Sequence, residues 1–157
     1  MAKPKAAKRK AVKPNPAKPK VAKPNAPKPR VAKANAVKRE NAVLAELSAI
    51  CLSLPETARR DMNGHADFRV RGKVYAYFLN NHHGDEIVSV CCKSELGENV
   101  DRASREPNRF YLPAYIGPRG WFGLRLDRGA IDWSEVRNLV ELSYALAAPK
   151  SLLKKIT

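Results

Sequence analysis

The sequence predicts an α+β protein, in which a mostly antiparallel sheet is flanked by N- and C-terminal helices and preceded by a disordered basic tail. Three observations support this prediction. Residues 1–39 carry 14 of the 30 basic residues and none of the 15 acidic ones. In residues 40–157, apolar residues recur at helical spacing near both ends. Between these ends, apolar and polar residues alternate, as is typical of strands that pack against helices.

The tail is a repeat with a period of ten residues, in which Asn15, Asn25 and Asn35 occupy equivalent positions. Seven of the 12 prolines lie in residues 1–39, and this segment has no aromatic residue, leucine or isoleucine. Proline removes backbone donors, and without large apolar side chains nothing offsets the entropy of ordering the chain. We therefore predict that residues 1–39 are disordered with polyproline II character, and that a single domain spans residues 40–157.

The charge of the tail predicts binding to nucleic acid. Each lysine or arginine that meets a phosphate releases a condensed cation, so such a segment binds a polyanion without a folded site. A segment that enters membranes would add aromatic residues or leucine, so no membrane partner is expected. The composition resembles the tails of linker histones and of bacterial histone-like proteins. The predicted phosphate contacts of the tail are Lys3, Lys5, Lys8, Arg9, Lys10, Lys13, Lys18, Lys20, Lys23, Lys28, Arg30, Lys33, Lys38 and Arg39.

The first half of the domain is predicted to form a helix and three antiparallel strands. Apolar residues lie at helical spacing from Asn41 to Leu54, and Pro55 ends the helix. Apolar and polar residues then alternate, Gly72 provides a hairpin turn, and a polar loop precedes the third strand. The predicted strands are 67–71, 73–79 and 86–92, and the loop is 80–85.

The second half is predicted to form a weak helix over 94–105, with Leu96, Val100 and Ala103 on its buried face. Two short strands, 110–112 and 121–126, enclose a protruding turn rich in glycine and proline. The last long helix begins after a cap at Asp132 or Ser134. Its apolar stripe is Trp133, Val136, Leu139, Val140, Leu142 and Leu146, and a short basic segment, 150–155, follows Pro149.

The domain resembles the MmcQ/YjbR family. The resemblance rests on Gly64–Tyr77, on Val88–Val90 and above all on Phe110–Asp127, where glycines, prolines and aromatic residues keep a fixed spacing. Trp133, Ser143-Tyr144 and Ala148-Pro149-Lys150 extend it, and the tail lies outside it. The resemblance implies a fold like that of the frataxin-type CyaY proteins, with a double-wing arrangement that is commonly labelled DNA-binding.

Five residues of the domain are predicted to contact phosphates. Gly117-Pro118-Arg119-Gly120 is expected to hold Arg119 outward, with Tyr115 and Trp121 packed beneath it. The alternative is that these charges belong to solvated strand faces and that Trp121 is a core residue. The predicted contacts are Arg69, Arg71, Lys73, Arg119 and Trp121.

The sequence predicts neither an enzyme nor a bound metal or cofactor. His65 and Asp67 lie two residues apart, but no catalytic motif surrounds them. The pairs His82-His83 and Cys91-Cys92 offer metal ligands of the right type, yet adjacent side chains on a strand point to opposite faces. The dispersed acidic residues also argue against the iron binding that a CyaY-like fold suggests. Three cysteines, two of them adjacent, favour reduced thiols in the cytoplasm.

Two functions follow from these observations. The first is a cytoplasmic, nucleoid-associated protein that binds DNA largely without sequence specificity, in which the tail supplies affinity and the domain tunes it. The second is an interaction module for a protein or ligand that its tail localises on nucleic acid, RNA included. Lysine meets the phosphates of DNA and RNA in the same way, so the sequence does not distinguish them. It does not predict an oligomeric state either.

Overall fold

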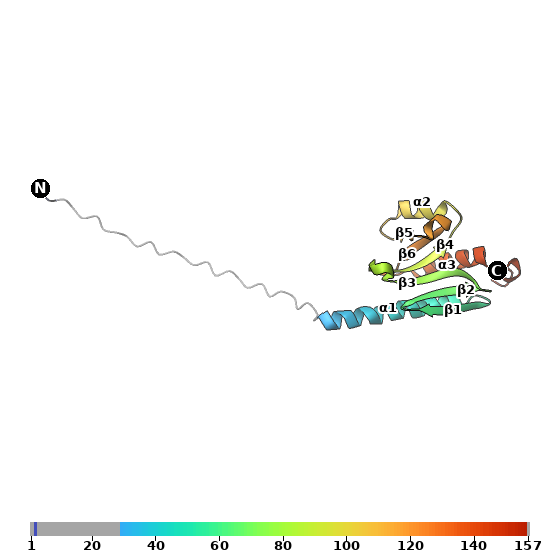
Figure 1. Ribbon diagram of the computed structural model, residues 1–157, viewed down its shortest axis with the longest axis horizontal. Helices are drawn as coiled ribbons and strands as arrows, with labels where there is room; N and C mark the ends of the chain where they lie inside the picture. Colours follow the sequence, from blue (N-terminus) through green and yellow to red (C-terminus); the bar gives the residue numbers. More distant parts are fainter. Residues whose placement is uncertain (1, 3–28, 157) are drawn as a thin grey trace.

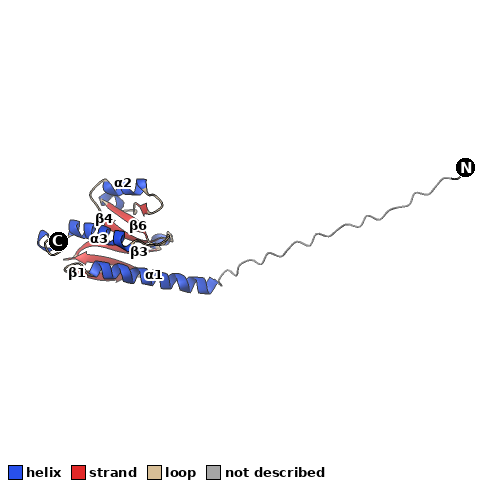
Figure 2. Cartoon of the chain, turned by 180° about the vertical axis from the view of Figure 1, so that it is seen from behind, coloured by secondary structure: helices blue, strands red, loops and turns tan. Residues whose placement is uncertain are grey.

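One face of a six-stranded antiparallel sheet is covered by two long helices in the computed structural model, which describes Ala2 and residues 29–156 (Figures 1 and 2). The strand order is β1-β2-β3-β4-β6-β5, and every neighbouring pair is antiparallel. The predicted α+β class is therefore confirmed. The bounds are α1 Pro29–Leu52, β1 Thr57–Met62, β2 His65–Val70, β3 Lys73–Asn80, η1 His82–Gly84, β4 Val88–Lys93, α2 Glu98–Arg105, β5 Phe110–Tyr111, η2 Gly117–Arg119, β6 Trp121–Arg125, α3 Trp133–Ala147 and α4 Lys150–Leu153.

Helix α1 begins much earlier than the sequence predicts. Residues 29–39, which we assigned to the disordered tail, form its first three turns, and residues 30–39 are exposed. The physical reason lies in the prolines, because Pro29 is the last one before Pro55 and proline is tolerated in the first turn of a helix. The alanine, lysine and arginine residues that follow favour helix. The rest of the predicted tail lies outside the described residues, apart from Ala2.

Two tight hairpins join the first three strands, and only the second was expected from the sequence. Asn63 and Gly64 have φ angles of 44° and 85°, and Arg71 and Gly72 have 46° and 81°. Consecutive positive φ angles are those of a type I′ turn, which Asn-Gly favours strongly. We missed β1 because its sequence, Thr-Ala-Arg-Arg-Asp-Met, is polar, as suits a strand at the edge of the sheet.

A β-bulge in β3 decides which side chains reach the core. Phe68 pairs with Ala76 and Arg69 with Val74, so Tyr75 is the extra residue. Tyr75 and Ala76 therefore both face the helices and are fully buried. The next residue, Tyr77, points to the opposite face, where it lies beside Trp121.

Buried polar groups connect α1 and α3 to the sheet. The Tyr75 hydroxyl donates to the carbonyl oxygen of Cys51 at 3.0 Å, and the Tyr144 hydroxyl donates to that of Pro55 at 2.8 Å. The Ser143 hydroxyl donates to the Tyr75 carbonyl oxygen at 2.5 Å and accepts from the Lys93 amide at 2.7 Å. These bonds fix both helices on the same face of the sheet.

The C-terminal helix forms as predicted, but the buried faces of α2 and α3 differ from the prediction. The Asp132 side chain caps α3 by accepting from the amides of Ser134 and Glu135. Leu142 and Leu146, however, are exposed, and so are Leu96, at 78 %, and Val100. Asn99 is buried instead, because its side-chain amide donates to the carbonyl oxygens of Gly117 and Trp121. Among the described residues, no helix has the length and apolar character needed to cross a membrane.

We predict that Ser143→Ala lowers the free energy of unfolding by about 1 to 3 kcal/mol, because it leaves the buried Tyr75 carbonyl and the partly buried Lys93 amide without their partner. Urea denaturation measures this loss. Ser134→Ala, on an exposed position of the same helix, is the matched control and should change stability by less than about 0.5 kcal/mol. Equal effects of the two substitutions would contradict the role assigned to Ser143.

Candidate binding groove on the open face of the sheet

The face of the sheet opposite α1 and α3 carries no long helix and gathers most of the polar and aromatic chemistry of the domain (Figures 1 and 2). Strand register places on this face one residue or more from each strand. They are Arg60, Asp67, Arg69, Tyr77, Leu79, Ser89, Cys91, Tyr111, Trp121, Gly123 and Arg125.

A buried carboxylate lies near one edge of this face, between two arginines. Asp67 is fully buried and accepts hydrogen bonds from Arg69 at 2.7 Å and from Arg60 at 2.7 Å. The hydrogen bonds from Arg69, followed by those from Arg60, hold the pKa of Asp67 below its ordinary value. With one carboxylate between two guanidinium groups, the cluster keeps a single net positive charge.

Two of the residues predicted to contact phosphates thus form ion pairs within the domain. Arg69 pairs with Asp67, and Arg71 pairs with Glu56 at 2.5 Å. Lys73 is exposed and has no ion pair among the described residues. Contact of these residues with nucleic acid remains a prediction, but an ion pair must open before either arginine meets a phosphate.

The turn before β6 has the predicted outward cation but not the predicted packing. Arg119 is exposed in η2 and is in no ion pair within the described part of the chain. Trp121 is buried, at 8 % exposure, and its ring lies 5.1 Å from that of Tyr77. Tyr115 is 81 % exposed, so the expectation that it packs beneath Arg119 is wrong. Trp121 is therefore a core residue, the alternative that the sequence left open.

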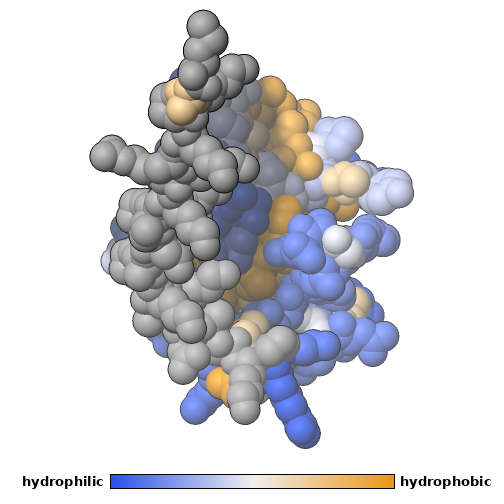
Figure 3. All heavy atoms as spheres, turned by 90° about the vertical axis from the view of Figure 1, so that its left-hand side faces the viewer, coloured by the Kyte–Doolittle hydropathy of each residue, from blue (hydrophilic) through white to orange (hydrophobic). Residues whose placement is uncertain are grey.

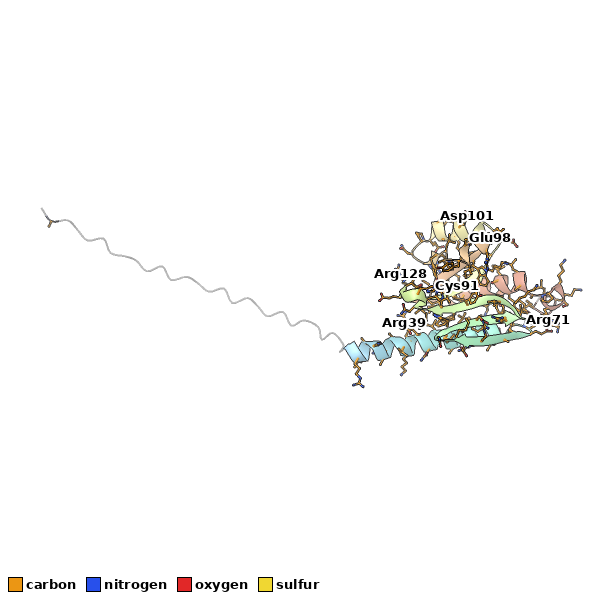
Figure 4. All side chains as sticks on the ribbon, in the orientation of Figure 1. Arg39, Arg71, Cys91, Glu98, Asp101 and Arg128 are labelled. Atoms are coloured by element: carbon orange, nitrogen blue, oxygen red, sulfur yellow. The ribbon has the colours of Figure 1, made fainter. Side chains whose placement is uncertain are left out.

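The hairpin cations and the described cations of the basic segment lie at opposite ends of the domain. Figure 4 shows Arg39 at the end from which α1 projects and Arg71 at the far end. Arg30, Lys33, Lys38 and Arg39 are exposed on α1. The other predicted tail contacts, Lys3 to Lys28, lie outside the described residues. The two sets of cations therefore do not form one continuous basic surface.

A groove of about 450 Å³ opens beside Tyr77 on the open face. Its floor is formed by Tyr77, Leu79 and Tyr111, one wall by the η1 loop and the other by residues 113–116. The walls approach each other where the rings of His83 and Tyr115 lie 6.4 Å apart. The lining is mostly apolar and aromatic, with Asp85 as its carboxylate. Such a groove suits a ligand with apolar faces and a cationic group.

Three imidazoles run from the sheet into this groove. His65 lies 5.2 Å from His82, and His82 lies 4.0 Å from His83, measured between ring centroids. Burial, and then the neighbouring His82, lower the pKa of His65. No group of three or more histidine, cysteine, aspartate or glutamate residues in the described chain is arranged to hold a metal ion. Of the three, His82 and His83 line the groove.

The floor of the groove depends on a glycine. A Cβ atom on Gly123 would lie 2.2 Å from Cε1 of Tyr111, so the ring of Tyr111 lies directly across this position. The Tyr111 hydroxyl is 2.8 Å from the Ser89 hydroxyl and 3.7 Å from the Cys91 sulfur. Burial raises the pKa of Cys91 to about 11, which leaves the thiol protonated and unsuited to act as a nucleophile near neutral pH.

The topology and the open, grooved face define a class of protein: an α+β domain with helices on one side of an antiparallel sheet. Residues 52–146 match the model of the YjbR family. The chain belongs to this family, which confirms the resemblance seen in the sequence. A comparison with curated proteins finds no match.

The fold also resembles that of a solved protein. The crystal structure of Deinococcus radiodurans protein DR2400, with the family-model domain DUF419, matches with a TM-score of 0.57 and 16 % sequence identity. The match covers 72 % of this chain and 86 % of the other. At this identity the likeness shows a shared fold, and the chemistry of the groove rests on the residues of this chain.

We predict that Asp67→Asn lowers the free energy of unfolding by about 1 to 3 kcal/mol at neutral pH, because the charge between two arginines is lost. Because the pKa of Asp67 is lowered in the folded state, its ion pairs stabilise the fold at pH values above its ordinary pKa of 3.8. This contribution is lost as the pH falls below about 4. Urea denaturation at neutral and acidic pH measures this effect. The free energy of unfolding should fall less on acidification in the variant than in the parent protein.

Asp61→Asn is the matched control. Asp61 pairs with Arg59 at an exposed site, where an ion pair contributes about 0 to 1 kcal/mol. A destabilisation of Asp61→Asn as large as that of Asp67→Asn would show that burial of the carboxylate is not what matters.

Proposed function

We propose that this protein is a non-enzymatic, largely sequence-independent DNA-binding protein whose affinity comes from residues 1–39. The observation that carries the proposal is the separation of charge. Residues 40–157 carry 16 basic and 15 acidic residues, and seven of their arginines pair with carboxylates, whereas residues 1–39 carry 14 basic residues and no acidic one. A surface of paired charges gives little net attraction to a polyanion.

The first turns of α1 also carry basic residues that form no ion pair within the described part of the chain. Arg30, Lys33, Lys38 and Arg39 are exposed on a helix that projects from the domain (Figure 1). They continue the ten cations of residues 1–28 without an intervening acidic residue. The basic segment thus ends on a rigid helix that holds the domain beside the bound nucleic acid. Association with the nucleoid is part of this proposal.

A second function is favoured by the groove. The domain is nearly neutral, and its groove is lined by aromatic rings and by the Asp85 carboxylate, so its chemistry suits a ligand or protein segment better than phosphates. In this view the domain is an interaction module that its basic segment localises on DNA or RNA. The two functions differ in whether the domain itself adds nucleic-acid affinity.

We predict that the affinity for duplex DNA falls at least about a thousandfold between about 50 and 200 mM salt, with a log-log slope near −7 if roughly eight phosphates are contacted. Fluorescence anisotropy of a labelled duplex measures both values. A chain that starts at Glu40 retains every core residue, since the first is Val43, and should lose most of this binding. Retained affinity in this chain would refute the proposed division between segment and domain. Competition by structured RNA distinguishes the two nucleic acids.

We predict that replacing Arg30, Lys33, Lys38 and Arg39 with glutamine makes the salt slope less steep by up to about four units. The matched control replaces Arg105, Lys150, Lys154 and Lys155, which are also exposed, and changes the net charge equally. An equal change of slope in both variants would show that net charge, rather than the basic segment, governs binding.

Arg119 offers a test of the domain's own contribution. We predict that Arg119→Ala changes folding stability by less than about 0.5 kcal/mol, because the side chain is exposed. If the turn contacts one phosphate, the salt slope of the chain that starts at Glu40 becomes less steep by about one unit. Trp121→Ala should instead cost about 3 to 5 kcal/mol, since its ring is buried. An unchanged slope for Arg119→Ala would remove this turn from the interface.

A further inference from the structure

We propose that the groove on the open face binds a proline-containing segment of this same chain, Lys13–Pro19, and that DNA competes with it for that segment. This inference goes beyond nucleic-acid binding, because it assigns an occupant to the groove. It rests on three independent observations: the aromatic lining of the groove, the spacing of residues in the segment, and the position from which α1 leaves the domain.

The groove has the chemistry that recognises proline. Tyr77 and Tyr111 form its floor, and Tyr115 and Pro113 belong to one wall. Tyr115 is 81 % exposed, which is unusual for a large ring that contributes nothing to the core. Prolines in a polyproline II helix dock on aromatic grooves because their conformation is already restricted, so little entropy is lost on binding.

The segment presents a complementary face. Polyproline II has three residues per turn, so Lys13, Pro16 and Pro19 lie on one side of such a helix. Two prolines then face the tyrosine rings while the lysine faces a carboxylate. Asp85 lines the groove, and Glu86 follows it in sequence. The positive charge of Lys13 therefore complements the negative charge at the groove wall that the η1 loop forms.

The chain can reach the groove. Glu40 of α1 accepts a hydrogen bond from the Asn80 side chain at 2.8 Å, and the η1 loop begins just after Asn80. From Glu40 the helix runs back to Pro29 over about 16 Å. The ten residues from Pro29 to Pro19 span about 31 Å in polyproline II geometry, enough to return to the groove. Pro24 and Pro27 are too close to the start of α1 to do so.

The end of the domain from which α1 projects is hydrophilic around an apolar strip, as Figure 3 shows. Because the segment is tethered there, its effective concentration is in the millimolar range, and even weak docking is populated. DNA that captures Lys13 and Lys18 draws the segment out of the groove. Occupancy of the groove and binding of DNA are then mutually exclusive for this part of the chain.

Paramagnetic relaxation on the full-length chain tests the proposal. Cys51, Cys91 and Cys92 are fully buried, so a nitroxide reacts selectively with a cysteine introduced by Ala17→Cys. On the isotope-labelled chain, the amide signals of His83 and Tyr115 should broaden severalfold more than those of Arg71 and Gly72 at the far end of the sheet. Duplex DNA should reverse this broadening.

Three variants of the spin-labelled chain distinguish docking from general electrostatic attraction. Pro16→Ala with Pro19→Ala keeps the length and charge of the segment and should abolish the selective broadening. Tyr115→Ala should do the same, and a thermal melt equal to that of the parent shows that the fold is intact. Lys13→Gln should only weaken it. Broadening that is equal at both ends of the sheet, or that survives the proline substitutions, overturns the proposal.

A mixed sample distinguishes docking within one chain from docking between two copies. It combines spin-labelled chains that are not isotope-enriched with isotope-enriched chains that carry no spin label. Broadening that is absent from the mixture supports docking within one chain. Equal broadening in the mixture assigns the segment to a second copy and overturns the intramolecular arrangement. Neither result depends on the salt slope for DNA, so failure of this proposal is distinguishable from failure of the proposed function.

Discussion

Tyr75 is the residue on which the arrangement of this domain depends. It is the extra residue of a β-bulge, it is fully buried, and its hydroxyl and carbonyl groups bond to Cys51 of α1 and Ser143 of α3. Both long helices are thereby fixed on one face of the sheet. The same bulge reverses the alternation of β3, so Tyr77 and Leu79 face away from the helices. One local irregularity thus builds the core and exposes the floor of the groove.

The domain nearly balances its own charge, with 16 basic and 15 acidic residues in 40–157. Asp67 holds two arginines, and Arg71, Arg109 and Arg125 each pair with a neighbouring carboxylate. The pairs of Arg71 and Arg109 are exposed and contribute little to stability. Their effect is to leave a nearly neutral surface. Under the proposed function, attraction to a polyanion depends on the acid-free segment that precedes the domain and on the first turns of α1.

The groove and α1 lie close together at one end of the domain. The η1 loop, the Asn80 side chain and Glu40 bring the start of the domain beside the groove wall. Membership of the YjbR family and the fold shared with the Deinococcus radiodurans protein account for the sheet and its helices. The aromatic lining, the imidazole cluster and the proline repeat belong to this chain, and the proposed chemistry rests on them.

The sequence by itself determined the α+β class, the family, the hairpin at Gly72, the capped C-terminal helix and the separation of charge, because periodicity, turn residues and composition are local properties. It also contained the Asn63-Gly64 turn, a signal that we overlooked because the adjoining strand is polar. Only the tertiary structure decided that Trp121 is buried while Tyr115 is exposed, that Asp67 pairs with two arginines, and that His83 approaches Tyr115. These facts depend on strand order and on the bulge at Tyr75, which bring together residues that are distant in sequence.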